Sequence, residues 1–366
     1  FPEMIAEWYR THDYNFLALS DHNTLSQGQR WMKLNAVTER SKDKALQKYL
    51  ERFGEHWVET RGEGEVQEVR LKPLDEFRSL LEERGKFILI QGEEISDKVG
   101  DKPVHMNATN VNEEFQPLGG ATVPEAIDAN LRAVKDQAER AGREVIVHLN
   151  HPNFHYGVTA EELAAVLSER YFEVYNGHPG INHLGDDEHV TVEKLWDIAN
   201  TIRVANLNGP LLMGVATDDS HNYHDDRDST PGRGWIMVRA RHLTPESLVR
   251  AMEKGDFYAS RCVVLDKIEN TDSGISISIA PQDGVEFQTE FIGTRRAAAD
   301  SEIAKENIGE VFATIDGVAP QYTFSGDELY VRAVIHSSRP HPNPSFEGQV
   351  EEAWTQPVQP HAAKTD

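Results

Sequence analysis

The sequence feature that most restricts the fold is a short apolar run that ends abruptly in acidic residues and a histidine. Residues 211–221 read LLMGVATDDSH, so an apolar stretch is followed at once by Asp218, Asp219 and His221. A continuous apolar run of this length is typical of a strand buried in a parallel sheet. Because ligands bind at the carboxyl ends of such strands, the run predicts an α/β fold with Asp219 and His221 at its functional edge.

Other short apolar runs end in the same way. The strand predicted at 16–20 leads into Asp21 and His22, the strand at 87–90 into Glu94, and the strand at 145–147 into His151. Amphipathic helices are predicted between such strands, at 122–141, 160–169, 190–207 and 245–254. Alternation of strands and helices predicts a parallel sheet with right-handed crossovers, most simply a barrel.

The pattern changes after residue 260. The stretch at 275–279 alternates strictly between apolar and polar residues, as do stretches near 311–315 and 330–335. Such alternation indicates antiparallel strands with one buried face. We therefore expect an α/β barrel over residues 1–260, a small antiparallel β-sandwich-like domain over 261–346 and a flexible tail over 347–366.

A charged segment from Gln27 to Lys86 separates two of the predicted strands. We expect helices at 39–53 and 73–84, with a hairpin that turns at 62–64. An insertion of this size either covers the mouth of a site or decorates the surface. The sequence leaves both interpretations open.

The composition excludes several classes of function. Lys and Arg number 37 against 61 Asp and Glu, a net charge of −24, which argues against binding to nucleic acids or anionic membranes. A small anionic substrate remains possible because bound cations reverse the charge locally. Cys262 is the only cysteine, so no disulfide within the chain can form and the compartment stays open.

The residues at the predicted strand ends are suitable metal ligands. They are His22, Glu94, His105, His151, Asp219 and His221. Neutral imidazoles combined with a few carboxylates favour Zn, Mn or Fe, whereas calcium requires more oxygen ligands. A carboxylate that bridges two ions would create a multinuclear site, which suits hydrolysis because it activates water and polarises the substrate.

The motifs and their order resemble the PHP superfamily, named for polymerase and histidinol phosphatase. The matching pieces are LSDHNT at 19–24, GEEIS at 92–96, His105, the HP at 151–152 and the DSH at 219–221. Within the superfamily, HLNHPN at 148–153, EKLWD at 193–197 and TDDSH at 217–221 look like a carbaryl-hydrolase-like branch. The resemblance covers roughly residues 1–260 and implies a distorted (β/α)7 TIM-like barrel with two or three metal ions.

The resemblance also implies roles for single residues. Glu94 would bridge two metals, with Asp219 on the first and His105 and His151 on the second, while His22 and His221 would hold a third. The family opens with an H-x-H strand that no residue here matches. We therefore expect a fragment or processed form with a gap in its barrel, in which the first and third metal sites lack ligands.

The remaining polar residues near the site have weaker assignments. We assign Asp21 a catalytic role through orientation of a neighbour, together with Glu94 and Asp219, and Asp218 a role as a cap or supporting group. His178, Arg227 and Arg233 are our candidates for contact with an anionic substrate, since Arg binds such groups bidentately. Solvent-exposed loop residues are the simpler interpretation of all three.

The sequence therefore predicts a metal-dependent hydrolase, most simply a phosphoesterase, that acts on a small molecule. Cleavage of a carbamate, carboxylic ester or amide at the same site is the alternative. A non-catalytic binding protein with a degenerate site is a further alternative, supported by the absent H-x-H. The β domain has no cluster of His with Asp or Glu, so we expect it to contribute no ligands.

We expect this chain to bind close to one tight metal ion, because only the site formed by Glu94, His105 and His151 has three protein ligands and an open position for water. Metal analysis of the purified protein by mass spectrometry measures the ratio. Two or three tight ions per chain would show that the assignment of ligands is wrong.

Overall fold

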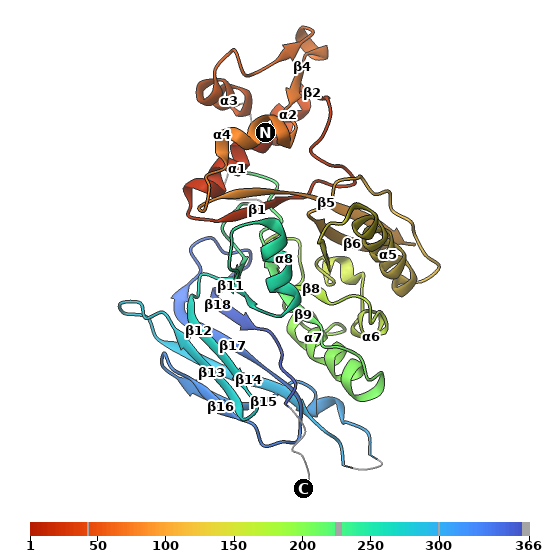
Figure 1. The fold of residues 1–366 in the computed structure, drawn as a ribbon, viewed down its shortest axis with the longest axis vertical. Helices are drawn as coiled ribbons and strands as arrows, with labels where there is room; N and C mark the ends of the chain where they lie inside the picture. The colour runs from red at the N-terminus through yellow and green to blue at the C-terminus, as the bar shows by residue number, and fades with distance from the viewer. Residues whose placement is uncertain (42–43, 224–228, 299–300, 361–366) are drawn as a thin grey trace.

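The computed structural model describes residues 1–41, 44–223, 229–298 and 301–360. Figure 1 shows three parts along the long axis: the 27–86 insertion at the top, a first sheet with its helices in the middle and a β module at the bottom. None of the described helices combines the length and apolar character needed to cross a membrane.

The first sheet is mixed and open. Its strands lie in the order β1 (Phe16–Leu19), β5 (Ile88–Val99), β6 (Lys102–Thr109), β7 (Ile146–Leu149), β8 (Tyr171–Asn176) and β9 (Met213–Thr217). The β1–β5, β7–β8 and β8–β9 pairs are parallel, whereas β6 is antiparallel to both neighbours. Within the described residues β1 pairs only with β5 and β9 only with β8. The sheet of the described residues is therefore a curled half-barrel with the antiparallel strand β6 in its interior, and a full barrel is not shown.

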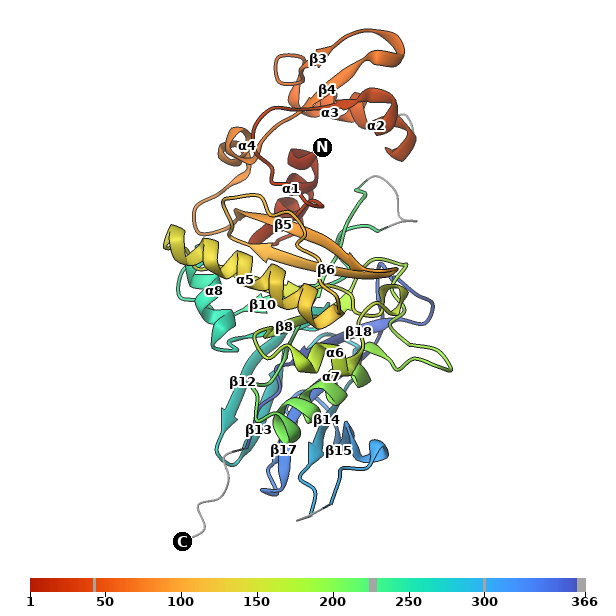
Figure 2. The same ribbon diagram turned by 90° about the vertical axis from the view of Figure 1, so that its right-hand side faces the viewer.

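Helices cover the outer face of this sheet. They are α5 (Val123–Ala141), α6 (Ala160–Ala165) and α7 (Val192–Thr201), which continues as a π-helical turn (Ile202–Asn206). Figure 2 shows these helices side by side on the face turned to the viewer. Leu131 of α5 and Trp196 of α7 belong to the same buried apolar cluster as Phe172 of β8. Burial of this cluster fixes the strand ends that carry the polar residues.

The insertion packs on the first helix of the chain, α1 (Pro2–Thr11). It contains β2 (Arg30–Lys33), α2 (Leu34–Ser41), α3 (Ala45–Phe53), β3 (Thr60–Arg61), η1 (Gly64–Val66), β4 (Glu68–Leu71) and α4 (Leu74–Leu81). Tyr49 and Trp57 both donate hydrogen bonds to Glu3 of α1, the latter at 2.8 Å. The predicted helix at 39–53 is thus two helices, since α2 begins at Leu34 and α3 at Ala45.

The β module consists of two sheets that share a core. The larger contains β10 (Trp235–Val238), β11 (Phe257–Arg261), β18 (Val350–Thr355), β17 (Glu328–Pro340), β14 (Phe287–Arg295) and β15 (Glu310–Asp316). The smaller sheet contains β12 (Leu265–Thr271), β13 (Gly274–Ile279) and β16 (Gln321–Thr323). Three further helices lie elsewhere along the described chain, namely η2 (Phe154–Tyr156), α8 (Pro245–Glu253) and η4 (Lys305–Asn307). Ile277 of β13 and Phe291 of β14 lie in the core between the sheets.

The strands of this module extend beyond the bounds that we predicted for it, and the division into domains stays a prediction. Strands β10 and β11 precede residue 262 yet belong to the larger sheet. Residues 350–355 form β18 between β11 and β17 rather than a flexible tail. Glu352 of β18 can be buried because it pairs with Arg261 and, at 2.7 Å, with His336. A charged residue at a buried position breaks the apolar pattern, which is why the sequence did not indicate a strand here.

A buried ion pair joins the β module to α7. The Arg332 guanidinium of β17 donates to both carboxylate oxygens of Asp197, at 2.9 and 2.8 Å, and to Glu193 at 3.0 Å. The side chains of Arg332 and Asp197 are 1% and 3% exposed. Two charges removed from water in this way depend on each other.

We expect Arg332→Met to lower the free energy of unfolding by about 3–5 kcal/mol, because it leaves the Asp197 carboxylate buried without its partner. Arg295→Met is the matched control. Arg295 pairs with Asp327 at the surface, so its loss should cost no more than about 1 kcal/mol. Urea unfolding followed by circular dichroism measures both, and equal losses in the two variants would contradict this assignment.

Candidate metal centre

The centre of the candidate site is the buried carboxylate of Glu94 on β5. The chain that leaves β1 runs beside it, since Glu94 N donates to Asp21 O at 3.0 Å and Asn23 N donates to Glu94 O at 2.8 Å. This pairing places His22 next to Glu94. His105 comes from the adjacent strand β6, where it pairs with Ser96. Three segments that are distant in the sequence therefore bring their side chains to one point.

Three histidines contact the Glu94 carboxylate. His105 Nδ1 lies 3.0 Å and His151 Nε2 3.6 Å from Glu94 Oε1, while His22 Nδ1 lies 3.2 Å from Oε2. Asn150 donates a further hydrogen bond to Oε1 at 3.1 Å. Burial by itself raises the pKa of Glu94, but its hydrogen bonds with His105 and His151 outweigh burial and hold the pKa below its ordinary value. Glu94 is therefore an ionised carboxylate at neutral pH.

Asp219 and His221 lie beside this cluster, at the carboxyl end of β9. The ring centroids of His221 and His22 are 6.1 Å apart. Burial, and after it the charges of Glu94 and Glu173, raises the pKa of Asp219. Asp219 has a φ of +47°, a left-handed conformation that few residues other than glycine adopt. The structure thus brings all six predicted ligands to one region.

The other candidates occupy different positions. Asp21 is exposed and lines the cavity, and it contributes its backbone oxygen to the Glu94 segment. The His178 ring lies 5.4 Å from the His221 ring, so a role in substrate contact stays a prediction. Arg233 is only 3% exposed, and its Nη1 donates to Gly177 O at 2.8 Å. Arg233 therefore contacts the protein itself in this structure, and its contact with substrate stays a prediction. Arg227 lies outside the described residues.

Sequence reasoning missed a buried carboxylate that supports the site. Glu173 of β8 accepts hydrogen bonds from His151 N at 2.7 Å, Asn176 Nδ2 at 2.8 Å and Thr217 Oγ1 at 2.7 Å. Burial raises the pKa of Glu173, but its contacts with His148, His151 and Asn176 together outweigh burial and the pKa is lowered. The available signal was an acid in the middle of the apolar run YFEVYN, where a charge needs partners.

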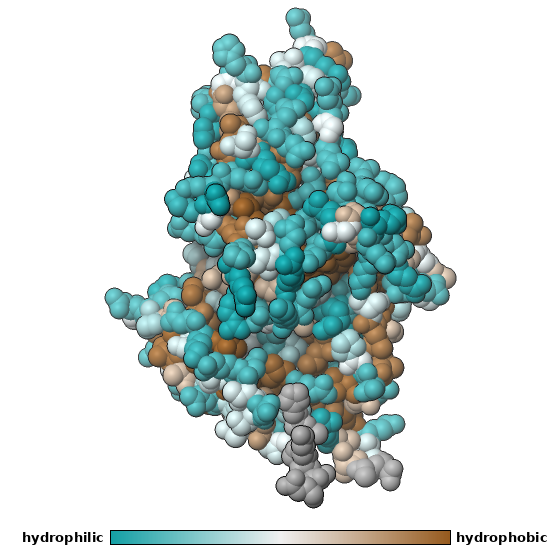
Figure 3. Space-filling view, in the orientation of Figure 1, coloured by the Kyte–Doolittle hydropathy of each residue, from teal (hydrophilic) through white to brown (hydrophobic). Residues whose placement is uncertain are grey.

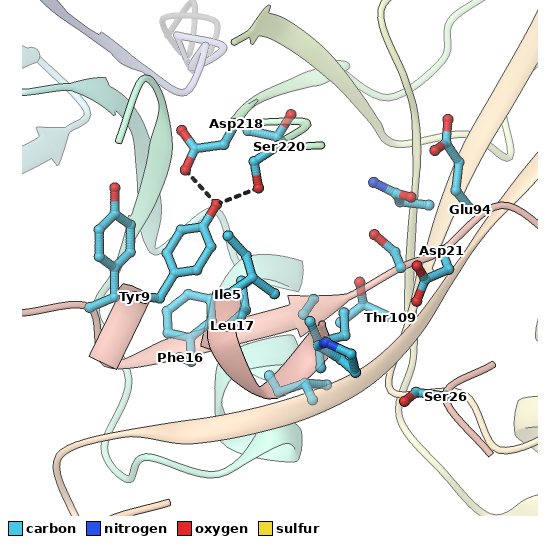
Figure 4. Close-up of a pocket in the computed structure, with 18 of the residues that line it drawn as sticks. Ile5, Tyr9, Phe16, Leu17, Asp21, Ser26, Glu94, Thr109, Asp218 and Ser220 are labelled. Carbon is cyan, nitrogen blue, oxygen red and sulfur yellow. Dashed lines mark hydrogen bonds between the residues drawn. The ribbon is translucent and has the colours of Figure 1, made fainter. Parts of the chain in front are cut away.

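The site opens into a cavity of about 1350 Å³. Figure 4 shows Glu94 and Asp21 on one side of this cavity and the apolar Ile5, Phe16 and Leu17 on another. The Tyr9 hydroxyl forms hydrogen bonds with Asp218 and Ser220. Residues of β1, β9 and β10 line it, so it occupies the open side of the first sheet. Figure 3 shows hydrophilic residues over the insertion and hydrophobic ones beneath it, at the level of β1.

The insertion forms part of the cavity wall. Trp31 and Met32 of β2 line the cavity, together with Lys72 and Pro73 from the segment after β4. Of the two interpretations that the sequence left open, the structure therefore favours a segment that borders the site. The ammonium group of Lys72 forms an ion pair with Glu59, so its charge is already balanced within the insertion.

The donor atoms fit a divalent transition metal. One donor each from His22, Glu94 and His105 lie within 4.8 Å of one another. Ligands of one ion with bonds of about 2 Å lie roughly 3–4 Å apart, which the distances from Glu94 to His22 and His105 match. Imidazole nitrogens with one ionised carboxylate are the donors that Zn, Mn and Fe prefer.

Comparisons with known proteins add one distant likeness. Neither the protein-family models nor the curated proteins contain a match to this chain. A solved structure of a two-domain protein from Bacteroides vulgatus, described as containing a predicted PHP-like metal-dependent phosphoesterase, aligns with 96% of this chain and 90% of its own. The TM-score is 0.36 and the identity 13%, values too low to assign a fold or an activity.

We expect His105→Ala to weaken the binding of Zn²⁺ or Co²⁺ by more than the roughly 10–100-fold that loss of a supporting residue costs. His56→Ala is the matched control, because His56 is an exposed histidine of the insertion. Titration against a competing chelator measures both affinities. An unchanged affinity in His105→Ala would exclude this histidine as a ligand.

Proposed function

We propose that this protein is a metal-dependent hydrolase that cleaves phosphoesters. The observation that carries the proposal is the contact of three imidazoles with one buried, ionised carboxylate, beside a second carboxylate and imidazole, at the wall of a large cavity. A purely structural carboxylate needs fewer partners, and Glu94 lines the large cavity together with His22, Asp219 and His221. This combination favours a metal site.

The number of donors supports a second, weakly held ion beside the tight one. His22, Glu94, His105, His151, Asp219 and His221 exceed the four ligands of a tetrahedral ion. Bound divalent ions supply two effects, a lower pKa of water and withdrawal of charge from the phosphoryl oxygens. Phosphoester cleavage benefits most from a pair of ions, because charge develops on both the attacking and the leaving oxygen.

The residues of the chain hold this arrangement in place. Glu94 supplies a negative charge that its hydrogen bonds keep ionised, and Asn150 fixes the orientation of the same carboxylate. Glu173 holds the backbone of His151, and Asn176 donates to Asp219 Oδ2 at 3.1 Å. Since the His178 ring lies next to that of the candidate ligand His221, the His178 imidazole is placed to contact an anionic substrate group.

The same site would also suit a carbamate, carboxylic ester or amide, because an ion polarises a carbonyl as it does a phosphoryl group. Two substrate classes separate the alternatives. With added Mn²⁺ or Zn²⁺, we expect hydrolysis of p-nitrophenyl phosphate to exceed that of p-nitrophenyl acetate and of a naphthyl carbamate. The reverse order would favour the carbonyl chemistry, and metal binding without any turnover would favour a binding protein.

We expect Glu94→Gln to reduce phosphoester hydrolysis at least about 100-fold, because an amide cannot replace an ionised carboxylate between cations. Glu93→Gln is the matched control. Its side chain points away from the site and accepts a hydrogen bond from Phe115 N at 2.9 Å. Steady-state assays on both variants measure the effect, and equal activity in Glu94→Gln and the unaltered protein would contradict the proposal.

A further inference from the structure

We propose that Asn343, in the loop between β17 and β18, is a positioning residue for the candidate metal centre. This proposal rests on the proposed metal-dependent function. The β module contributes none of the six candidate ligands, yet the Asn343 side chain contacts residues 230–233, which pair with the segment that holds Asp219 and His221. The module would then act on the site through hydrogen bonds rather than by packing alone.

The first step is the pairing of two segments, 218–222 and 229–234. Ser229 O accepts hydrogen bonds from His221 N at 2.9 Å and from Asn222 N at 3.0 Å, and Ser229 Oγ donates to Asp219 O. The Asp218 carboxylate accepts from the backbone N–H of Arg233 at 2.6 Å and of Gly234 at 2.8 Å. The position of 229–234 therefore determines the position of Asp219 and His221.

The second step joins 229–234 to the β module. Asn343 Nδ2 donates to Thr230 Oγ1 at 2.9 Å and to Pro231 O at 3.0 Å, and Asn343 Oδ1 accepts from Arg233 Nε at 3.3 Å. The amide nitrogen and the amide oxygen of Asn343 therefore both form hydrogen bonds with the segment 229–234. The Asn343 backbone is itself held, since its N–H donates to His341 Nδ1 at 3.1 Å.

A second path leads from Arg233 to the other side of the site. Arg233 Nη1 donates to Gly177 O at 2.8 Å. Gly177 lies between His178, whose ring neighbours His221, and Asn176, which binds the Asp219 carboxylate. A Cβ atom at Gly177 would lie 2.7 Å from Asp218 O and 2.8 Å from Arg233 Cβ, so these segments are in direct contact. Asn343 therefore supports Asp219 from two directions.

The conformation of Asp219 explains why such support matters. A φ of +47° is less favourable than the ordinary helical or extended conformations even for aspartate, so contacts with the surroundings help to hold it. Its backbone oxygen and its carboxylate each have a hydrogen-bond partner, in Ser229 and Asn176. Loss of Asn343 releases the segment that carries Ser229, so Asp219 can relax towards an ordinary conformation and leave the metal-binding geometry.

The test is metal affinity in the full-length chain. We expect Asn343→Ala to weaken the binding of Co²⁺ about tenfold and to alter its visible absorption spectrum, at a temperature where the variant remains folded. Thr230→Val, which removes one partner, should have a smaller effect in the same direction. The double variant should be no worse than Asn343→Ala alone, because both substitutions break the same contact. Glu347→Ala, an exposed residue of the same loop, is the matched control and should change neither quantity.

The outcomes are distinguishable. If Asn343→Ala lowers the melting temperature but leaves the Co²⁺ affinity and spectrum unchanged, Asn343 is a packing residue and the proposal is overturned. Additive effects of Thr230→Val and Asn343→Ala would also overturn the path through Thr230. If the unaltered chain itself binds no Co²⁺, the proposed function fails, and the role of Asn343 fails with it.

Discussion

The arrangement of the site depends on the cost of burying the Glu94 carboxylate. A charge removed from water must be compensated by hydrogen bonds or by opposite charge. Here His105, His151, His22 and Asn150 surround the carboxylate, and they come from three separate parts of the chain. The neighbouring strands must therefore keep their register, since a slip of one residue would turn each side chain to the opposite face.

Supporting groups extend outwards from this carboxylate in successive shells. Glu173 fixes the backbone of His151, and Asn176 connects Glu173 to Asp219. Beyond them, Arg233 and Asn343 connect the site to the β module, and Arg332 joins the same module to α7. The module is thus attached to the rest of the molecule both near the site and at a distance from it, and Gln349 with Tyr175 and Gln356 with Gly214 add further contacts.

The sequence was most informative where a candidate metal ligand follows a predicted strand within a few residues. His22, Glu94, His151 and Asp219 stand out because polar residues interrupt apolar runs at predictable places. Glu173 was missed because it lies within an apolar run, where nothing local reveals its partners. For Arg233 we predicted contact with substrate or with solvent, because only tertiary contacts, with Gly177 and Asn343, explain why an arginine is buried.

Sequence patterns could not predict the order of the strands in the first sheet or the extent of the β module, for related reasons. Alternation of strands and helices predicts that successive strands are adjacent and parallel, but it does not predict that β6 is antiparallel or which strands lie at the edges of the sheet. In β18, Glu351 and Glu352 interrupt the apolar pattern, and Glu352 is compensated by Arg261 and His336 on the adjacent strands. Pairing across the sheet, rather than local propensity, decides that such a segment is a strand.

The most direct test of this account is a crystal structure of the protein with Zn²⁺, with anomalous scattering recorded at the zinc edge. The account predicts an anomalous peak about 2 Å from a Glu94 carboxylate oxygen and from the imidazole nitrogens of His105 and of His151 or His22. A peak elsewhere on the molecule, with Glu94 bound only to histidines and Asn150, would contradict it.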